Sequence, residues 1–283
     1  MSVVPKRVLM TLLSGLALSF ILGAGPSYAL EDFRVYRGVL VLEGKIVAGD
    51  YDKLRRFLAS KPTFEKITGG VFLASPGGNL AEAMKIGFLI RSLRLSTDAP
   101  SGPPTGGRKF GESLITPADL GNPGNYECAS ACFLIFVSGI YRNLYWAGRL
   151  GIHRPFQEES ELKKLGTNDI AQLNVRIKNL VERYLRQMNV RIKYADLMFS
   201  VPSSEVRWIT QDELDSDLSG FIPELKDVID TKCTPPATIA AVDKVGTMAA
   251  KQASEIAACR TQVEGQLRAR QPLEAWPKVF AGK

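Results

Sequence analysis

Ser130 and His153 are the two residues whose types and spacing best suit catalysis. Ser130 lies between two alanines in the run C-A-S-A-C, directly before an apolar stretch. Small neighbours let the backbone turn sharply into a helix, whose free N–H groups and positive dipole end can stabilise an oxyanion. His153 follows 23 residues later, and a neutral imidazole there could accept the serine proton. The pair predicts a nucleophile and a general base, although a helix N-cap and a structural histidine are the simpler interpretations.

His153 is the only histidine among the 283 residues. A single imidazole excludes every metal motif that needs two or three histidines, including H-E-x-x-H and the three-histidine zinc sites. We expect no metal and no other cofactor, and any mechanism with a histidine base must use His153.

A second turn of backbone N–H groups is predicted at Ser75-Pro76-Gly77-Gly78. It follows Gly70–Ala74, a short apolar run that is typical of a buried strand, and it precedes a helical pattern. Such a strand-to-helix junction could bind an oxyanion, although the four residues alone indicate only a tight turn.

The overall composition is that of a globular, mildly basic protein. Hydrophobic residues make up 45% of the chain, and 36 Lys and Arg against 29 Asp and Glu give a formal charge of +7. The basic residues are scattered and form no run with interleaved aromatics, so we expect no nucleic-acid partner.

The first 29 residues have the pattern of a signal peptide. Lys6 and Arg7 precede an apolar stretch of about 17 residues, and Ser27-Tyr28-Ala29 offers small residues to a signal peptidase. We expect cleavage after Ala29 and a periplasmic or secreted protein. The alternative is an N-terminal membrane anchor, because the stretch is close to the length that spans a bilayer.

An oxidising compartment favours disulfides among the four cysteines. We expect Cys233 to pair with Cys259 and tie a C-terminal helix to the preceding segment. Cys128 and Cys132 are four residues apart, a spacing that on a helix would put them on one face at marginal bridging distance, so they could be bridged or remain two small buried side chains.

Alternating patterns predict an α/β fold. Strands are expected over Val35–Leu42, Gly70–Ala74 and Leu95–Thr97, with helices over Asp50–Ser60 and Asn79–Leu93 between them. This order is typical of parallel β-α-β units with right-handed crossovers.

Residues 98–127 are rich in proline and glycine, and we expect a long functional loop at the rim of the site.

Beyond this loop we expect a helix over Phe133–Val137, then strands over Leu144–Ala147 and Leu150–His153. Further on come an amphipathic helix over Leu162–Met188 with Leu173, Ile177, Leu180 and Leu185 inward, a strand at Trp208-Ile209, and a capping box of Thr210 and Glu213.

Three segments together resemble the Clp protease proteolytic subunit of the crotonase-like superfamily, and more closely its secreted bacterial relatives. They are Val71–Gly78 (V-F-L-A-S-P-G-G), Cys128–Cys132 (C-A-S-A-C) and Gly151–Phe156 (G-I-H-R-P-F). The resemblance covers about residues 35–222. It implies a spiral core of repeated β-β-α units over residues 30–230, with 98–127 as an insertion and 231–283 as a helical C-terminal appendage.

The resemblance also implies site roles. Ser130 matches the family nucleophile and His153 the general base, while Gly78 and Ala131 match the oxyanion-hole amides and Gly77 shapes the turn.

The third catalytic residue is less well matched. Alignment on the tryptophan before the capping box places Val206 where family proteases have an acid, with Glu205 one residue away. A one-residue shift turns a side chain to the other face of a strand, so Glu205 fits only an irregular backbone. Asp196 and Asp212 are further candidates, and a Ser–His dyad without an acid is the remaining one.

The predicted activity is ATP-independent serine peptidase or hydrolase chemistry on a peptide or protein substrate. No ATPase partner is expected in a secreted protein, and the long helix could support a homo-oligomer. The main alternative is an inactive relative that binds peptides or proteins. A Ser–Lys peptidase and acyl-CoA chemistry are less favoured, since no lysine matches a motif and the secretory signal argues against acyl-CoA.

Overall fold

The computed structural model describes residues 30, 33–59, 67, 70–99, 127–144, 149–155, 165–233 and 246–268. The predicted signal peptide and its cleavage site lie outside the described residues, as do most of the 98–127 segment and the end of the C-terminal tail.

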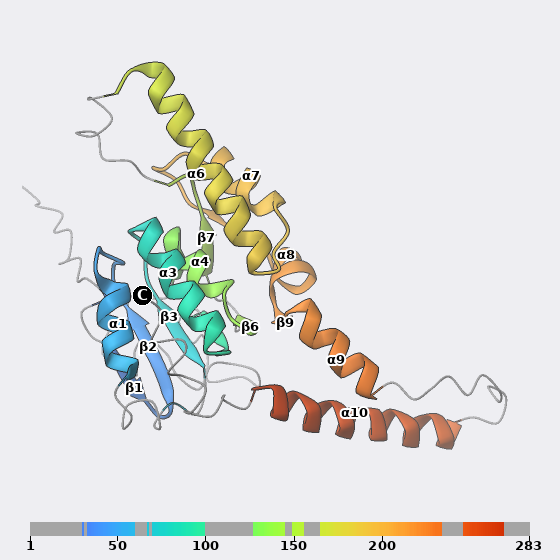
Figure 1. Cartoon of the computed structure of the whole chain (residues 1–283). Coiled ribbons are helices and arrows are strands. Elements are labelled where there is room, and N and C mark those ends of the chain that lie inside the picture. Colours follow the sequence, from blue (N-terminus) through green and yellow to red (C-terminus); the bar gives the residue numbers. More distant parts are fainter. Residues whose placement is uncertain are drawn as a thin grey trace, which may run out of the picture.

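The larger sheet has six strands and is mainly parallel at its centre (Figure 1). Its order is β1 (Arg34–Tyr36), β2 (Val39–Glu43), β3 (Val71–Ala74), β4 (Thr97–Ala99), β6 (Tyr141–Leu144) and β9 (Gly220–Phe221). Helix α1 (Asp50–Ala59) links β2 to β3, and α3 (Leu80–Ser92) links β3 to β4. These parallel β-α-β units confirm the predicted α/β class.

The smaller sheet carries the segments of chemical interest. Strand β7 (Arg149–Ile152) pairs in parallel with β5 (Glu127–Ala129) and antiparallel with β8 (Arg207–Trp208). Helix α4 (Ala131–Phe136) follows β5 after a single residue, and all six of its side chains are buried. It packs against α3, so the segment after Ser130 forms part of the hydrophobic core.

The strand predicted over Val35–Leu42 is wrong in its extent, because the structure divides it into the hairpin β1–β2. Arg37 and Gly38 have φ angles of 48° and 81°, and Tyr36 pairs with Val39 across them. Two successive positive φ angles suit the twist of a two-residue hairpin loop. A positive φ at an arginine is uncommon, so the residue types did not predict a turn at this position.

Helix α6 (Thr167–Gln187) is buried only at its C-terminal end, by Val181, Tyr184 and Leu185. Figure 1 shows the rest of α6 extending past the body of the molecule. The prediction that Leu180 faces inward is wrong: its exposed fraction is 41%, whereas its neighbour Val181 is fully buried, so Leu180 lies on the face of α6 that points away from the core. Leu173 and Ile177 are half-buried.

Tyr184 fixes the buried end of α6 to the core. Its hydroxyl donates a hydrogen bond of 2.7 Å to the carbonyl of Leu134 in α4. Gly87 of α3 leaves the space for that hydroxyl, since a Cβ atom there would lie 1.8 Å from it. The tyrosine therefore ties α6 to both α3 and α4.

A buried carboxylate anchors the segment that follows α6. Asp217 lies in the π-helical turn η1 (Leu214–Leu218), just after the short helix α8 (Gln211–Glu213), which opens with the predicted capping box of Thr210 and Glu213. Asp217 pairs with Arg191 at 3.1 Å and with Lys193, and it accepts a hydrogen bond of 3.1 Å from Tyr194. These contacts hold α7 (Lys193–Ser200) in place.

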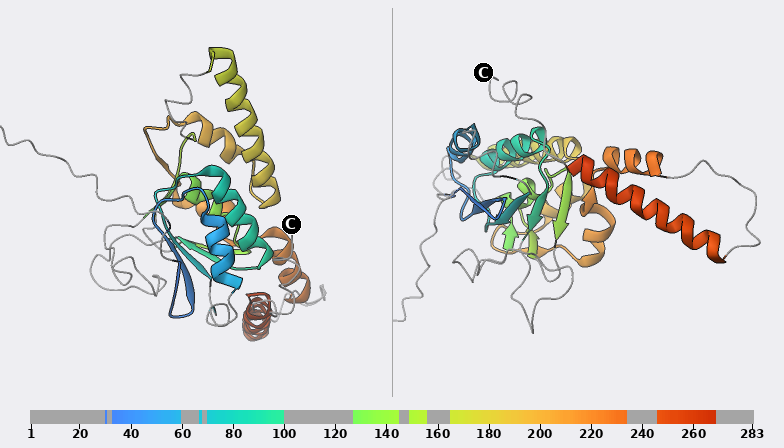
Figure 2. Two further views of the ribbon diagram at one scale, coloured as in Figure 1. Left: turned by 60° about the vertical axis from the view of Figure 1, so that its left-hand side comes forward. Right: turned by 90° about the horizontal axis from the view of Figure 1, so that it is seen from below.

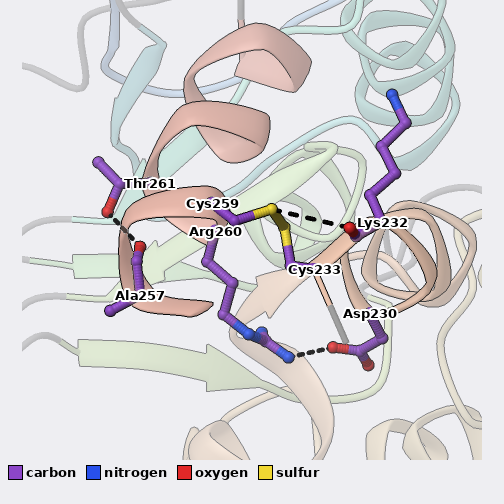
Figure 3. Close-up of a disulfide and its surroundings, with 7 residues drawn as sticks. All are labelled: Asp230, Lys232, Cys233, Ala257, Cys259, Arg260 and Thr261. Carbon is purple, nitrogen blue, oxygen red and sulfur yellow. Dashed lines mark hydrogen bonds and ion pairs between the residues drawn. A yellow bond between two sulfur atoms is a disulfide. The ribbon is translucent and has the colours of Figure 1, made fainter. Parts of the chain in front are cut away.

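The two C-terminal helices are joined covalently. Cys233, the last residue of α9 (Pro223–Cys233), forms the predicted disulfide with Cys259 of α10 (Gly246–Arg268), and Arg260 pairs with Asp230 beside it (Figure 3). A second disulfide joins Cys128 to Cys132, the pair that the sequence left open. Disulfides are typical of oxidising compartments. Among the described helices, none is long and apolar enough to cross a membrane.

We expect Asp217→Asn to lower the free energy of unfolding by about 2 kcal/mol at pH 7, because it removes a charge from a hydrogen-bonded cluster. Burial alone would raise the pKa of Asp217, but the hydrogen bonds from Lys193 and Tyr194 outweigh it and hold the pKa below its ordinary value of 3.8. The stabilisation is therefore complete above pH 3.8 and is lost as the pH falls through the depressed folded-state pKa.

Urea unfolding of wild type and variant between pH 2 and pH 7 measures this difference. Asp215→Asn is the matched control, because Asp215 lies exposed on the same π-helical turn. A gap between wild type and Asp217→Asn that stays constant down to the most acidic pH would contradict the assignment.

Candidate active site

Ser130 is the single residue between β5 and α4, and its backbone is strained. Its φ and ψ angles are 57° and −121°, a conformation that residues with a Cβ atom rarely adopt. Although Ser130 occupies the N-cap position of α4, its side chain makes no capping hydrogen bond. The hydroxyl is therefore not used to cap the helix, and the simpler structural interpretation of this serine loses its main support.

Backbone hydrogen bonds hold β5 and the adjoining Ser130 from both sides. On one side, Ser75 donates to the carbonyl of Glu127 at 2.8 Å and accepts from the N–H of Ala129 at 3.0 Å. On the other, the N–H of Ser130 donates to the carbonyl of Gly151 at 2.9 Å. The end of β3, the Ser130 turn and β7 thus lie side by side, although they come from three distant parts of the sequence.

Gly77 packs directly on the Ser130 turn. A Cβ atom on Gly77 would lie 2.6 Å from the Cβ of Ser130 and 2.6 Å from the carbonyl oxygen of Ala129. Gly77 also has a φ of 98°. Both the close approach and the backbone conformation require glycine at this position.

Two backbone N–H groups near Ser130 are candidates for binding an oxyanion. The N–H of Gly77 is used by the side chain of Ser75, at 3.1 Å, whereas the N–H of Gly78 has no hydrogen-bond partner in the described part of the chain. Ala131 is the first residue of α4, so its N–H precedes the first intrahelical acceptor. These are the two N–H groups that the sequence singled out.

His153 directly follows β7, the strand beside Ser130. The parallel pairing matches Ala129 with Gly151. Ser130, the first residue after β5, and His153, the first residue after β7, therefore lie at the same end of the small sheet. His153 is half-buried, and its Nδ1 lies 2.7 Å from the carbonyl oxygen of Arg154. A carbonyl can only accept, so Nδ1 carries the proton and Nε2 of the neutral ring is left as the acceptor.

Arg154 is fixed by the end of α7. Its N–H donates to the carbonyl of Val201 at 3.0 Å, and its guanidinium donates twice to the carbonyl of Phe199, at 2.9 and 3.1 Å. A cation at the C-terminal end of a helix also interacts favourably with the helix dipole. The carbonyl that orients His153 is therefore held by α7.

The candidate acids lie elsewhere. Antiparallel pairing of Ile152 with Arg207 brings Val206 next to His153 in the register, and Glu205 lies exposed in a turn closed by its N–H to Pro202. Among the described residues, no hydrogen bond joins Glu205 and His153.

Asp196 forms an ion pair of 2.6 Å with Lys178, and Asp212 is exposed on α8. Within the described ranges, no three His, Cys, Asp or Glu side chains are grouped as metal ligands.

Sequence reasoning did not identify the contribution of Gly151. Its carbonyl holds Ser130, and a Cβ atom on it would lie 2.5 Å from Val206 and 2.8 Å from the Trp208 ring. A glycine two residues before the only histidine was the available signal. The carbonyl of Arg154 had no such signal, because every residue has a carbonyl.

Neither a family model nor a curated relative matches the chain. Among solved structures, a mutant of the 1510-N membrane-bound stomatin-specific protease aligns at 13% identity and a TM-score of 0.39, covering 69% of this chain and 83% of that one. A ClpP1 mutant from Listeria monocytogenes aligns at 16% identity and a TM-score of 0.39, covering 65% and 89%.

We expect Gly77→Ala to displace the Ser130 turn and to lower the melting temperature by several degrees, because the added Cβ has no space against Ser130 and Ala129. Calorimetry measures the melting temperature. Labelling with a fluorophosphonate, which reacts with activated serines, measures the reactivity of Ser130. Labelling of Gly77→Ala should fall below detection.

Gly49→Ala is the matched control. Gly49 has a similar φ of 91° but nothing within 4 Å of an added Cβ, so this variant carries the backbone strain without the clash. Equal losses in the two variants would show that the contact with Ser130 is unimportant.

Proposed function

We propose that the protein is a serine hydrolase that cleaves peptide or protein substrates without ATP. The observation that carries this proposal is the conformation of Ser130: a strained strand-to-helix turn whose hydroxyl does not cap the helix. Strained backbone is found preferentially at functional sites, and serine hydrolases of other folds expose their nucleophile on such a turn. The neighbouring glycine turn and His153 supply the other groups that acyl transfer needs.

The proposed reaction assigns a role to each of these groups. Nε2 of His153 accepts the Ser130 proton as Oγ attacks the acyl carbon, and the N–H groups of Gly78 and Ala131 bind the developing oxyanion. The imidazolium then returns its proton to the leaving group, and water, activated by the same ring, releases the acyl group from Ser130. The carbonyl of Arg154 holds the ring in the required tautomer throughout.

The wider assignment follows the motif resemblance. We propose a crotonase-like and Clp-protease-like spiral core over residues 30–230, with a signal peptide cut after Ala29, the 98–127 segment as an insertion that gates access, and residues 231–283 as a helical appendage. The two disulfides support a periplasmic or secreted location. A homo-oligomer assembled through α6 and the absence of an ATPase partner belong to the same proposal.

One observation favours a second candidate, an inactive relative that binds peptides or proteins. Val206 stands next to His153 in the sheet register, at the position where the family resemblance expects an acid. Without a carboxylate, the imidazolium that forms during attack has only a carbonyl dipole to stabilise it. Turnover therefore separates the two candidates.

We expect Ser130→Ala and His153→Ala each to abolish fluorophosphonate labelling, because the serine hydroxyl needs its base to react at neutral pH. Gel detection of the labelled mature protein, with the labelled peptide identified by mass spectrometry, gives the result. Ser203→Ala, in an exposed turn, is the control and should label as wild type does. Folded wild-type protein that never labels would favour the binding module.

We expect Glu205→Gln, Asp196→Asn and Asp212→Asn to leave the labelling rate unchanged, because the acceptor for His153 Nδ1 is the carbonyl of Arg154. Loss of a true triad carboxylate costs about 10⁴ in kcat. The three second-order labelling rate constants, compared with wild type, measure the effect. A loss of this size in one variant only would identify that residue as the third catalytic member.

A further inference from the structure

We propose that the Cys128–Cys132 disulfide positions the nucleophile, by holding Ser130 in its positive-φ turn. The inference rests on the proposed function, and it adds a role for two residues that are not among the proposed catalytic groups. It depends on where the disulfide lies in the chain rather than on its presence alone.

The disulfide spans the turn symmetrically. Cys128 belongs to β5 and Cys132 is the second residue of α4, with Ser130 midway between them and the two Cα atoms 5.2 Å apart. Both cysteines are fully buried. The covalent link therefore closes a small loop whose central residue is the candidate nucleophile.

The hydrogen bonds around Ser130 hold its strand side and its helix side separately, and the disulfide joins the two sides. On the strand side, Ala129 is bonded to Ser75 and the N–H of Ser130 to Gly151. On the helix side, the N–H of Phe133 donates to the carbonyl of Ser130 at 3.0 Å. A φ of 57° is unfavourable for serine, so the turn persists only while its flanks are held together. The disulfide joins those flanks directly.

General stabilisation explains this disulfide less well. In the chain-entropy account, a cross-link stabilises the fold more when it closes a longer loop. Cys128 and Cys132 are separated by 4 positions, against 26 for Cys233 and Cys259. The second disulfide joins α9 to α10, and Figures 1 and 2 show these two helices away from α4, the helix that Ser130 precedes. We therefore expect the Cys128–Cys132 disulfide to affect the reactivity of Ser130 more than the stability, and the Cys233–Cys259 disulfide to affect the stability more than the reactivity.

The test compares two double variants of the mature protein, Cys128→Ala/Cys132→Ala and Cys233→Ala/Cys259→Ala. The first should lower the second-order rate of fluorophosphonate labelling by about 10²-fold, the cost of a small misplacement of a reacting group. The second should label as wild type does, although its melting temperature falls further. Unchanged labelling in the first variant, with the fold retained, overturns the inference.

A structural readout separates this inference from the hydrolase proposal. The three-bond HN–Hα coupling and the carbon shifts of Ser130, measured by NMR, report its φ angle whether or not the protein is active. If wild type never labels, the hydrolase proposal fails, and the inference is judged on this angle alone. Loss of the positive φ in Cys128→Ala/Cys132→Ala supports it, and retention overturns it.

A third sample covers the case in which Cys128→Ala/Cys132→Ala does not fold. In Cys233→Ala/Cys259→Ala the remaining disulfide can be reduced with a phosphine in dilute urea and then reoxidised. A labelling rate and a Ser130 φ that change on reduction and return on reoxidation support the inference. If both stay constant while mass spectrometry shows two free thiols, the disulfide has no positioning role.

Discussion

Strand β5 is hydrogen-bonded along both edges, to Ser75 on one side and to β7 on the other, and the geometry around Ser130 depends on this double pairing. The pairing connects the two sheets and fixes where the chain must turn into α4. Because α4 is wholly buried, the helix has little freedom to shift and relieve the turn. The strain is therefore concentrated at Ser130, whose hydroxyl makes no capping hydrogen bond to the helix that it begins.

The environment of His153 differs from that of a triad histidine in one chemical respect. A carboxylate both orients the imidazole and stabilises its positive charge, whereas the carbonyl of Arg154 orients the ring and offers only a dipole. The orientation of His153 therefore depends on a main-chain atom, which a substitution of the Arg154 side chain affects only through its hydrogen bonds to Phe199.

The support of the site extends outward in layers. Asp217 holds α7, the end of α7 holds Arg154, and the carbonyl of Arg154 holds His153. Ser130 is supported by Gly77, Gly151 and the adjacent disulfide. Strand β7 is common to the two halves of the site, because its Gly151 holds Ser130 and His153 follows its last residue.

The sequence by itself determined the α/β class, the parallel units, the candidate residues Ser130 and His153, and the Cys233–Cys259 pairing, because periodicity and local motifs record them. Only the tertiary structure decided the hairpin at Arg37, the exposed N-terminal half of α6, the second disulfide and the acceptor for His153. These depend on strand register, on which layer lies beneath a helix, and on main-chain atoms. Such features arise from the packing of distant segments, and no residue type records them.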